Sequence, residues 1–138
     1  MTITTNIKAI RDIMRKDTGV DGDAQRISQM VWMLFLKIFS DKEEEWEITI
    51  DNYESPLPNH FKWSAWAAND EGLTGDQLMD FINNELFPAL KELDITLSPQ
   101  AKIIRSVFED TYNYMKNGTL FRQVINEINK IDFNNTEE

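Results

Sequence analysis

Helical periodicity between residues 23 and 42 constrains the fold more than any other feature. Apolar side chains recur there at intervals of three and four residues, which is typical of one face of a helix: Ile27, Met30, Val31, Leu34, Phe35, Ile38 and Phe39. Trp32, Met33 and Leu36 add apolar surface on the other flank. We therefore expect a central core helix with Asp23 as its N-cap, covered on most of its sides by other elements.

Two further helices are predicted before and after this one. Ile3, Ile7, Ile10 and Met14 give a helix over residues 5–16, and the segment 17–22 ends it. Residues 46–73 lack a long helical pattern, contain two prolines and predict an irregular, aromatic-rich connector. Thr74–Gln77 then has the sequence of a capping box and predicts the start of the next helix.

Prolines and glycines divide the remaining chain. Pro88 predicts a stop or kink near residues 86–87, followed by a short helix over 89–93. Ser98 and Pro99 are a cap and a first helical residue, and the pattern after them continues to Met115. Asn117–Gly118 predicts the end of that helix, and Thr119 the start of a last one. These elements predict an all-α fold, a single bundle of about five or six helices.

Composition excludes several kinds of chemistry. The 138 residues include no cysteine and one histidine, His60, so disulfides and thiolate metal sites are impossible. The segment from Asp17 to Gly22 begins like a calcium loop, but Gly19 and Ser28 occupy positions that need oxygen ligands. The glycines show no phosphate-binding spacing. We therefore expect no catalytic, cofactor-binding or metal-binding residues in this chain.

No targeting or membrane segment is visible. The N-terminus lacks a signal peptide pattern, and the longest apolar run, residues 30–36, is far shorter than the roughly 20 residues that cross a bilayer. We expect a soluble, cytoplasmic protein.

Charge is divided unevenly along the chain. With 24 acidic and 14 basic residues the net charge is -10, which disfavours nucleic acid binding by the chain as a whole. Residues 1–45 hold seven basic and eight acidic residues, net -1, and residues 46–138 hold the other seven and sixteen, net -9. Five cations in the first part are candidates for DNA contact: Lys8, Arg11 and Arg15, spaced by three and four residues, with Lys16 and Arg26 nearby. The alternative is an ordinary solvated face.

Two other groups allow two interpretations each. Glu43–Glu45 is either a solvated charge run or faces a partner, unless the helix continues past it. The four tryptophans, Trp32, Trp46, Trp63 and Trp66, either fill the core or form a stacking platform for bases, and their helical spacing favours the core.

Four segments carry a family resemblance. Residues 22–41, 61–66 (FKWSAW), 81–90 (FINNELFPAL) and 131–134 (IDFN) are similar, in the same order, to the N-terminal helical domain of type I restriction-modification DNA methyltransferase (modification, M) subunits. The resemblance implies an all-α domain, residues 1–138, that precedes a catalytic domain which methylates adenine N6 in DNA with S-adenosylmethionine. Residues 134–138 would then begin a linker to that domain, which this sequence lacks.

The resemblance also implies a role without catalysis. Neither a Gly-x-Gly turn for the cofactor nor the Asn-Pro-Pro-aromatic motif for a flipped adenine occurs in this sequence. The implied partners are the specificity subunit, a second modification subunit, the restriction subunit and DNA in the assembled complex. Such a domain would serve subunit assembly and DNA clamping. A stand-alone acidic interaction module or DNA mimic is the alternative, and a small-substrate enzyme is disfavoured because no catalytic set is present.

Overall fold

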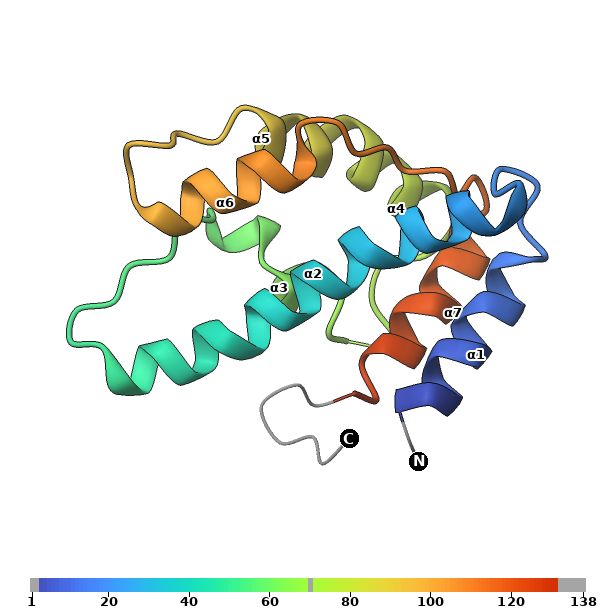
Figure 1. The fold of residues 1–138 in the computed structure, drawn as a ribbon, viewed down its shortest axis with the longest axis horizontal. Coiled ribbons are helices and arrows are strands. Elements are labelled where there is room, and N and C mark those ends of the chain that lie inside the picture. Colours follow the sequence, from blue (N-terminus) through green and yellow to red (C-terminus); the bar gives the residue numbers. More distant parts are fainter. Residues whose placement is uncertain (1–2, 70, 132–138) are drawn as a thin grey trace.

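The computed structural model describes residues 3–69 and 71–131, and these form helices and connecting segments without a strand (Figure 1). The helices are α1 (Ile3–Met14), α2 (Gly22–Thr49), α3 (Trp63–Trp66), α4 (Gly75–Phe81), α5 (Phe87–Lys91), α6 (Pro99–Phe108) and α7 (Gly118–Ile128), with a 3₁₀ turn at Asn59–Phe61. A π-helical segment, Ile82–Leu86, joins α4 to α5 without a break. Counting that continuous stretch once gives six helices in the described ranges, which confirms the all-α prediction.

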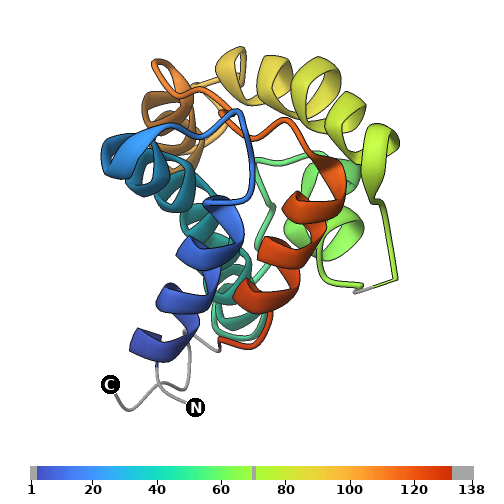
Figure 2. The same ribbon diagram turned by 90° about the vertical axis from the view of Figure 1, so that its right-hand side faces the viewer.

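α2 runs across the whole molecule and the other helices are arranged along it (Figure 1). α1 and α7 pack side by side near its N-terminal end, as Figure 2 also shows, and α5 and α6 lie along its upper side in Figure 1. Its N-cap position is Asp21 rather than Asp23, and the backbone N–H of Asp21 donates to Gln25 at 2.7 Å.

α2 extends to Thr49, seven residues beyond the predicted end at Lys42. The extension is held by aromatic contacts of Trp46 with Phe39 at 5.7 Å and with Tyr53 at 5.8 Å between ring centroids. Glu43 is 5% exposed and accepts a hydrogen bond from the Tyr53 hydroxyl at 2.9 Å. Burial and this carboxylate raise the pKa of Tyr53, which keeps its proton on the phenol. The solvated charge run is therefore wrong at Glu43, and the helix continues past it.

Trp32 lies at the centre of the core. It is 1% exposed, and its ring contacts Phe87, Phe108 and Phe121, from three different helices, at centroid distances of 4.8, 6.1 and 5.9 Å. Trp63 and Trp66 are also buried, and Trp46 packs partly buried against the same core. The prediction that the tryptophans fill the core is confirmed.

Pro88 does not stop the helix. The π-helical turn immediately before it widens the backbone, so the ring is accommodated at the start of α5. The chain therefore continues without a break to Lys91, and the short helix predicted at 89–93 is part of this longer one.

α6 begins as predicted, with the Ser98 hydroxyl accepting the Ala101 N–H at 3.2 Å, but it ends at Phe108 rather than Met115. The Lys91 ammonium donates to the carbonyls of Phe108 at 2.6 Å and Thr111 at 3.0 Å, which gives the end of the helix partners it would otherwise lack. After the helix, distant side chains bond backbone groups at residues 109, 111, 114, 116 and 117.

Two side chains supply most of those bonds. The Gln29 amide accepts the Tyr114 N–H at 2.7 Å and donates to Asn113 at 2.8 Å. The buried Asp17 carboxylate accepts the N–H groups of Lys116 and Asn117, at 3.0 Å each, and of Gly19 at 2.8 Å. Asp17 therefore joins the loop after α1 to the segment before α7.

The start of α7 and the start of α4 touch through two glycines. Asn117 is the N-cap of α7, accepting the Leu120 N–H at 3.0 Å, so Asn117 and Gly118 begin a helix instead of ending one. A Cβ on Gly118 would lie 1.9 Å from the Gly75 carbonyl oxygen, so close approach, not a left-handed backbone, requires glycine here. Thr74 precedes α4 as predicted, but the capping-box prediction is wrong because its side chain makes no cap hydrogen bond.

The substitution Gly118→Ala should therefore destabilise the protein by about 3 kcal/mol, because the added Cβ clashes with the backbone of Gly75, which cannot rotate away. Urea denaturation followed by circular dichroism measures the change. Thr119→Ala, at the exposed neighbouring position of the same helix, is the control and should alter stability by less than about 0.5 kcal/mol. Equal stabilities of the two variants would show that α4 and α7 do not meet at these glycines.

Candidate nucleic-acid interface

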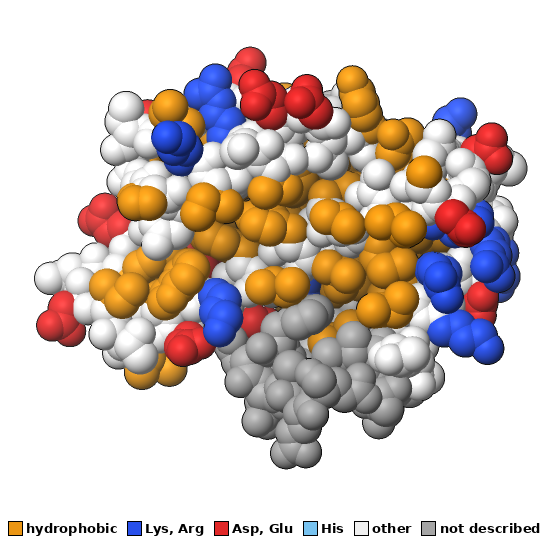
Figure 3. All heavy atoms as spheres, viewed as in Figure 1, with side chains coloured by type: hydrophobic (Ala, Val, Ile, Leu, Met, Phe, Trp, Pro, Cys, Tyr) orange, Lys and Arg blue, Asp and Glu red, His pale blue; other side chains and the backbone are white. Residues whose placement is uncertain are grey.

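α1 has an apolar side and a basic side. Ile10 and Met14 are fully buried, and α1 packs mainly on α7. Lys8, Arg11 and Arg15 are spaced by three and four residues beside this buried side and are exposed, and exposed Lys16 comes next in the chain. We call these four cations the basic stripe. Figure 3 shows Lys and Arg side chains gathered at the end of the molecule where α1 lies.

Most of the basic stripe is free to meet an anion. Arg15 contacts Asp12 at 3.6 Å, but both side chains are more than half exposed, and such a pair contributes about 1 kcal/mol at most. Within the described part of the chain, no carboxylate lies within salt-bridge distance of Lys8, Arg11 or Lys16. Exposed cations in this pattern can contact phosphates.

Arg26, the fifth candidate, is in a different position. Its side chain is only 15% exposed and is paired with Asp23 one helical turn earlier on α2. That pair lowers the pKa of Asp23, and the positive charges of Arg15 and Arg11 lower it further. Arg26 thus lies within the electrostatic reach of the basic stripe, while its own charge is already partnered.

A second exposed surface lies over α2 and α6, and it is apolar. Ile27, Val31 and Ile38 of α2 are 57%, 55% and 37% exposed, and Ile103 and Tyr112 are 56% and 65% exposed. We call these five residues the apolar band, and Figure 3 shows apolar side chains across this face. The sequence pattern predicts that α2 is covered on most of its sides, and that expectation is wrong at Ile27, Val31 and Ile38. Apolar residues occur on nearly every side of this helix, which was the sequence signal for such a surface. Periodicity does not show which sides other elements of the domain cover.

The remaining candidates have structural explanations. His60 is exposed and its ring lies against Phe61, 3.9 Å between centroids. A hollow of about 450 Å³ beside α5 is lined partly by Lys91, whose ammonium is bonded to backbone carbonyls. Within residues 3–69 and 71–131, no group of three acidic or histidine side chains is placed to hold a metal ion, and no helix is long and apolar enough to span a membrane.

The effect of the neighbouring arginines on the pKa of Asp23 can be tested by titration. Because cations favour its charged form, the stabilising interaction is present above the ordinary pKa of an aspartate and is lost as pH falls through the lowered pKa of Asp23. Arg26→Gln should raise the pKa of Asp23 towards its ordinary value, and Arg15→Gln should raise it less. Carboxyl NMR shifts followed against pH measure both changes, with Lys102→Gln as a control. An Asp23 titration unaffected by Arg26→Gln would contradict the pairing.

The chain is similar in sequence to a known protein family and to a known type I methylase subunit. The family described as the HsdM N-terminal domain matches residues 3–128. The methylase subunit of the type I restriction enzyme EcoEI from Escherichia coli is 54% identical over 140 residues, covering all of this chain but 29% of the relative.

Two solved structures agree with it. A protein from Vibrio vulnificus YJ016, assigned as a modification subunit of a type I restriction enzyme, superposes with a TM-score of 0.86 at 33% identity, over 96% of this chain and 31% of that one. A chain from a structural study of complex assembly and conformational transition in a type I R-M system superposes with a TM-score of 0.83 at 28% identity. The match covers 96% of this chain and 26% of that one. The chain spans less than a third of the length of these relatives. With its all-helical architecture and this match over nearly its whole length, the chain belongs to the HsdM N-terminal domain family.

Proposed function

We propose that this domain is a non-catalytic part of a type I DNA modification subunit, serving subunit assembly and DNA clamping. The observation that carries the proposal is the division of its exposed surface into a basic stripe on α1 and an apolar band over α2 and α6. Large exposed apolar patches mark interfaces, and exposed cations in register suit phosphates. One face would thus join protein and the other would meet DNA.

The chemistry of methylation belongs, in this proposal, to the rest of the subunit. The residues described here do not fit S-adenosylmethionine, because they contain no strand leading into a glycine-rich turn. Relatives are more than three times longer and leave ample length for a domain that binds S-adenosylmethionine and methylates adenine. The domain would work in the cytoplasm, next to specificity, restriction and second modification subunits.

The basic stripe would position DNA without reading its sequence, since phosphate contacts carry no base information. The net charge of -10 repels DNA from the chain as a whole. We therefore expect weak DNA binding by the isolated domain, with the basic stripe contributing only when other subunits hold the duplex against it.

Charge reversal tests this role. In the assembled modification enzyme, Lys8→Glu, Arg11→Glu and Arg15→Glu together should weaken DNA binding. Loss of up to three phosphate contacts should reduce the slope of log affinity against log salt by up to about 2.7. Fluorescence anisotropy with a duplex carrying the recognition sequence, measured across a salt series, gives both quantities.

The matched control changes the net charge equally at sites away from α1. Lys62→Glu, Lys102→Glu and Arg105→Glu together should leave the salt slope nearly unchanged, because none of these residues lies on the basic stripe. If both triple variants bind DNA equally, only net charge matters and the proposed contact by α1 is wrong.

A further inference from the structure

α2 is an incompletely covered core helix. Its apolar residues occupy almost its full circumference, yet the described residues bury only part of them. We infer that α2 and α6 form a docking groove for one amphipathic helix located C-terminal to this domain in the same modification subunit. The inference rests on the proposed function, because it requires the longer subunit.

The groove contains two hollows, each lined partly by exposed apolar residues. At one end, Phe35, Ile38 and Ile103 line a hollow of about 190 Å³ that reaches Trp46. At the other, Ile27, Val31 and Val107 line one of about 240 Å³ whose wall includes Trp32. Between them Phe35 contacts Phe108 at 6.0 Å, so the two helices meet below the surface and leave the space above open. From Ile27 to Trp46 the groove follows about 28 Å of α2, enough for about five turns of a docked helix.

The spacing of the exposed residues suits a helical ligand. Ile27, Val31 and Ile38 lie along one line of α2, and Ile103 faces them from α6. A ligand helix with apolar residues at positions i, i+3 or i+4, and i+7 would fill both hollows.

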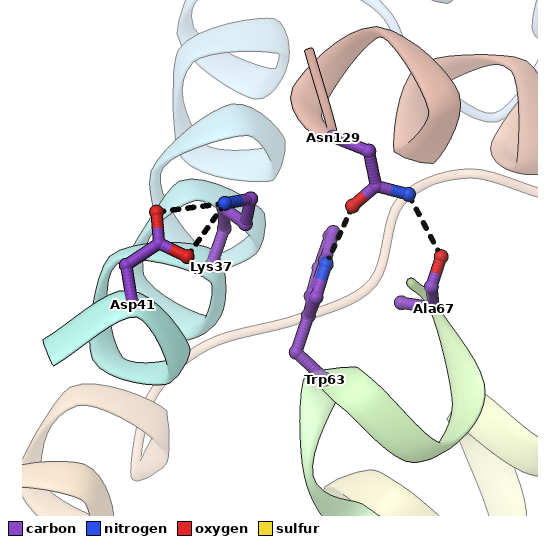
Figure 4. Close-up of polar contacts among 5 residues, drawn as sticks. All are labelled: Lys37, Asp41, Trp63, Ala67 and Asn129. Carbon is purple, nitrogen blue, oxygen red and sulfur yellow. Dashed lines mark hydrogen bonds and ion pairs between the residues drawn. The ribbon is translucent and has the colours of Figure 1, made fainter. Parts of the chain in front are cut away.

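The greater length of the relatives favours a helix from the same subunit as the occupant. α7 packs against α2, and just after it Asn129 bonds Trp63 at 2.7 Å and Ala67 at 2.9 Å (Figure 4). The last described residue, Ile131, follows two positions later. Relatives continue for more than twice the length of this chain, and a linked segment docks at high effective concentration.

Thiol protection tests the inference, because the chain contains no cysteine of its own. Val31→Cys and Ile103→Cys introduce thiols at exposed groove positions, and Gln123→Cys introduces one at an exposed position of α7 as a control. Alkylation by N-ethylmaleimide is followed at each site by peptide mass spectrometry in the 138-residue chain and in the full-length subunit. In the subunit, both groove thiols should react at least about tenfold more slowly than in the 138-residue chain. The reaction rate of the Gln123→Cys thiol should be the same in both proteins.

Three outcomes would overturn the inference. Equal reactivity of the groove thiols in both proteins means that the groove stays open in the subunit. Protection that rises with subunit concentration identifies a second copy as the occupant, and protection that needs the specificity subunit identifies that partner. The DNA-binding test changes charges on α1 and is independent of the thiol test. An unchanged salt slope together with protected groove thiols would contradict DNA clamping and still support the docking groove.

Discussion

Trp32 packs against Phe87, Phe108 and Phe121, and these contacts join three other helices to α2. The three rings come from α5, α6 and α7, so a single side chain of α2 contacts each of these helices. The Trp32–Phe87 and Trp32–Phe108 pairs are edge-to-face, a geometry that adds to the free energy of simple burial. Phe87 is the first residue of α5, directly after the π-helical turn and before Pro88.

Buried polar side chains then hold the segments that are not helical. Asp17 and Gln29 bond the backbone of residues 113–117, and Lys91 bonds the end of α6. Arg122 of α7 does the same for the connector, donating to the carbonyls of Leu73, Ala67 and Trp66 at 2.7 to 3.1 Å. Buried backbone groups need hydrogen-bond partners, and here side chains far away in sequence provide them. These hydrogen bonds join the two irregular segments to the helices around them.

This arrangement explains which predictions from sequence succeed. Local sequence signals predict the structure correctly where interactions between neighbouring residues determine it. Ser98 caps α6, and the spacing of Ile10 and Met14 predicts the buried side of α1. They fail where a distant side chain competes, as at Phe108, where the apolar pattern continues but the helix ends because Lys91 caps it. The expected linker at 134–138 lies outside the described residues.

The candidate site shows the same limit. Helical spacing places Lys8, Arg11 and Arg15 on one exposed face, and the structure confirms that placement, while their contact with DNA stays a prediction. Arg26 follows Asp23 by three residues, the spacing of an ion pair on a helix, so this pairing could have been predicted from the sequence. The apolar band could not be predicted in the same way. An apolar residue on a core-forming helix looks the same in sequence whether its own domain or another segment covers it.

Charge adds a direction to the proposed assembly. The basic stripe lies near the N-terminal end of α2, and exposed acids gather at its other end, at residues 44, 45, 47, 51 and 54. The 28 residues of α2 separate the two ends by about 40 Å, several times the Debye length of about 8 Å at physiological salt. DNA near α1 therefore does not feel the distant acids strongly, although the whole chain is acidic. In an assembled enzyme, the same separation would keep the acidic end turned away from the duplex while the apolar band between the ends is covered by protein.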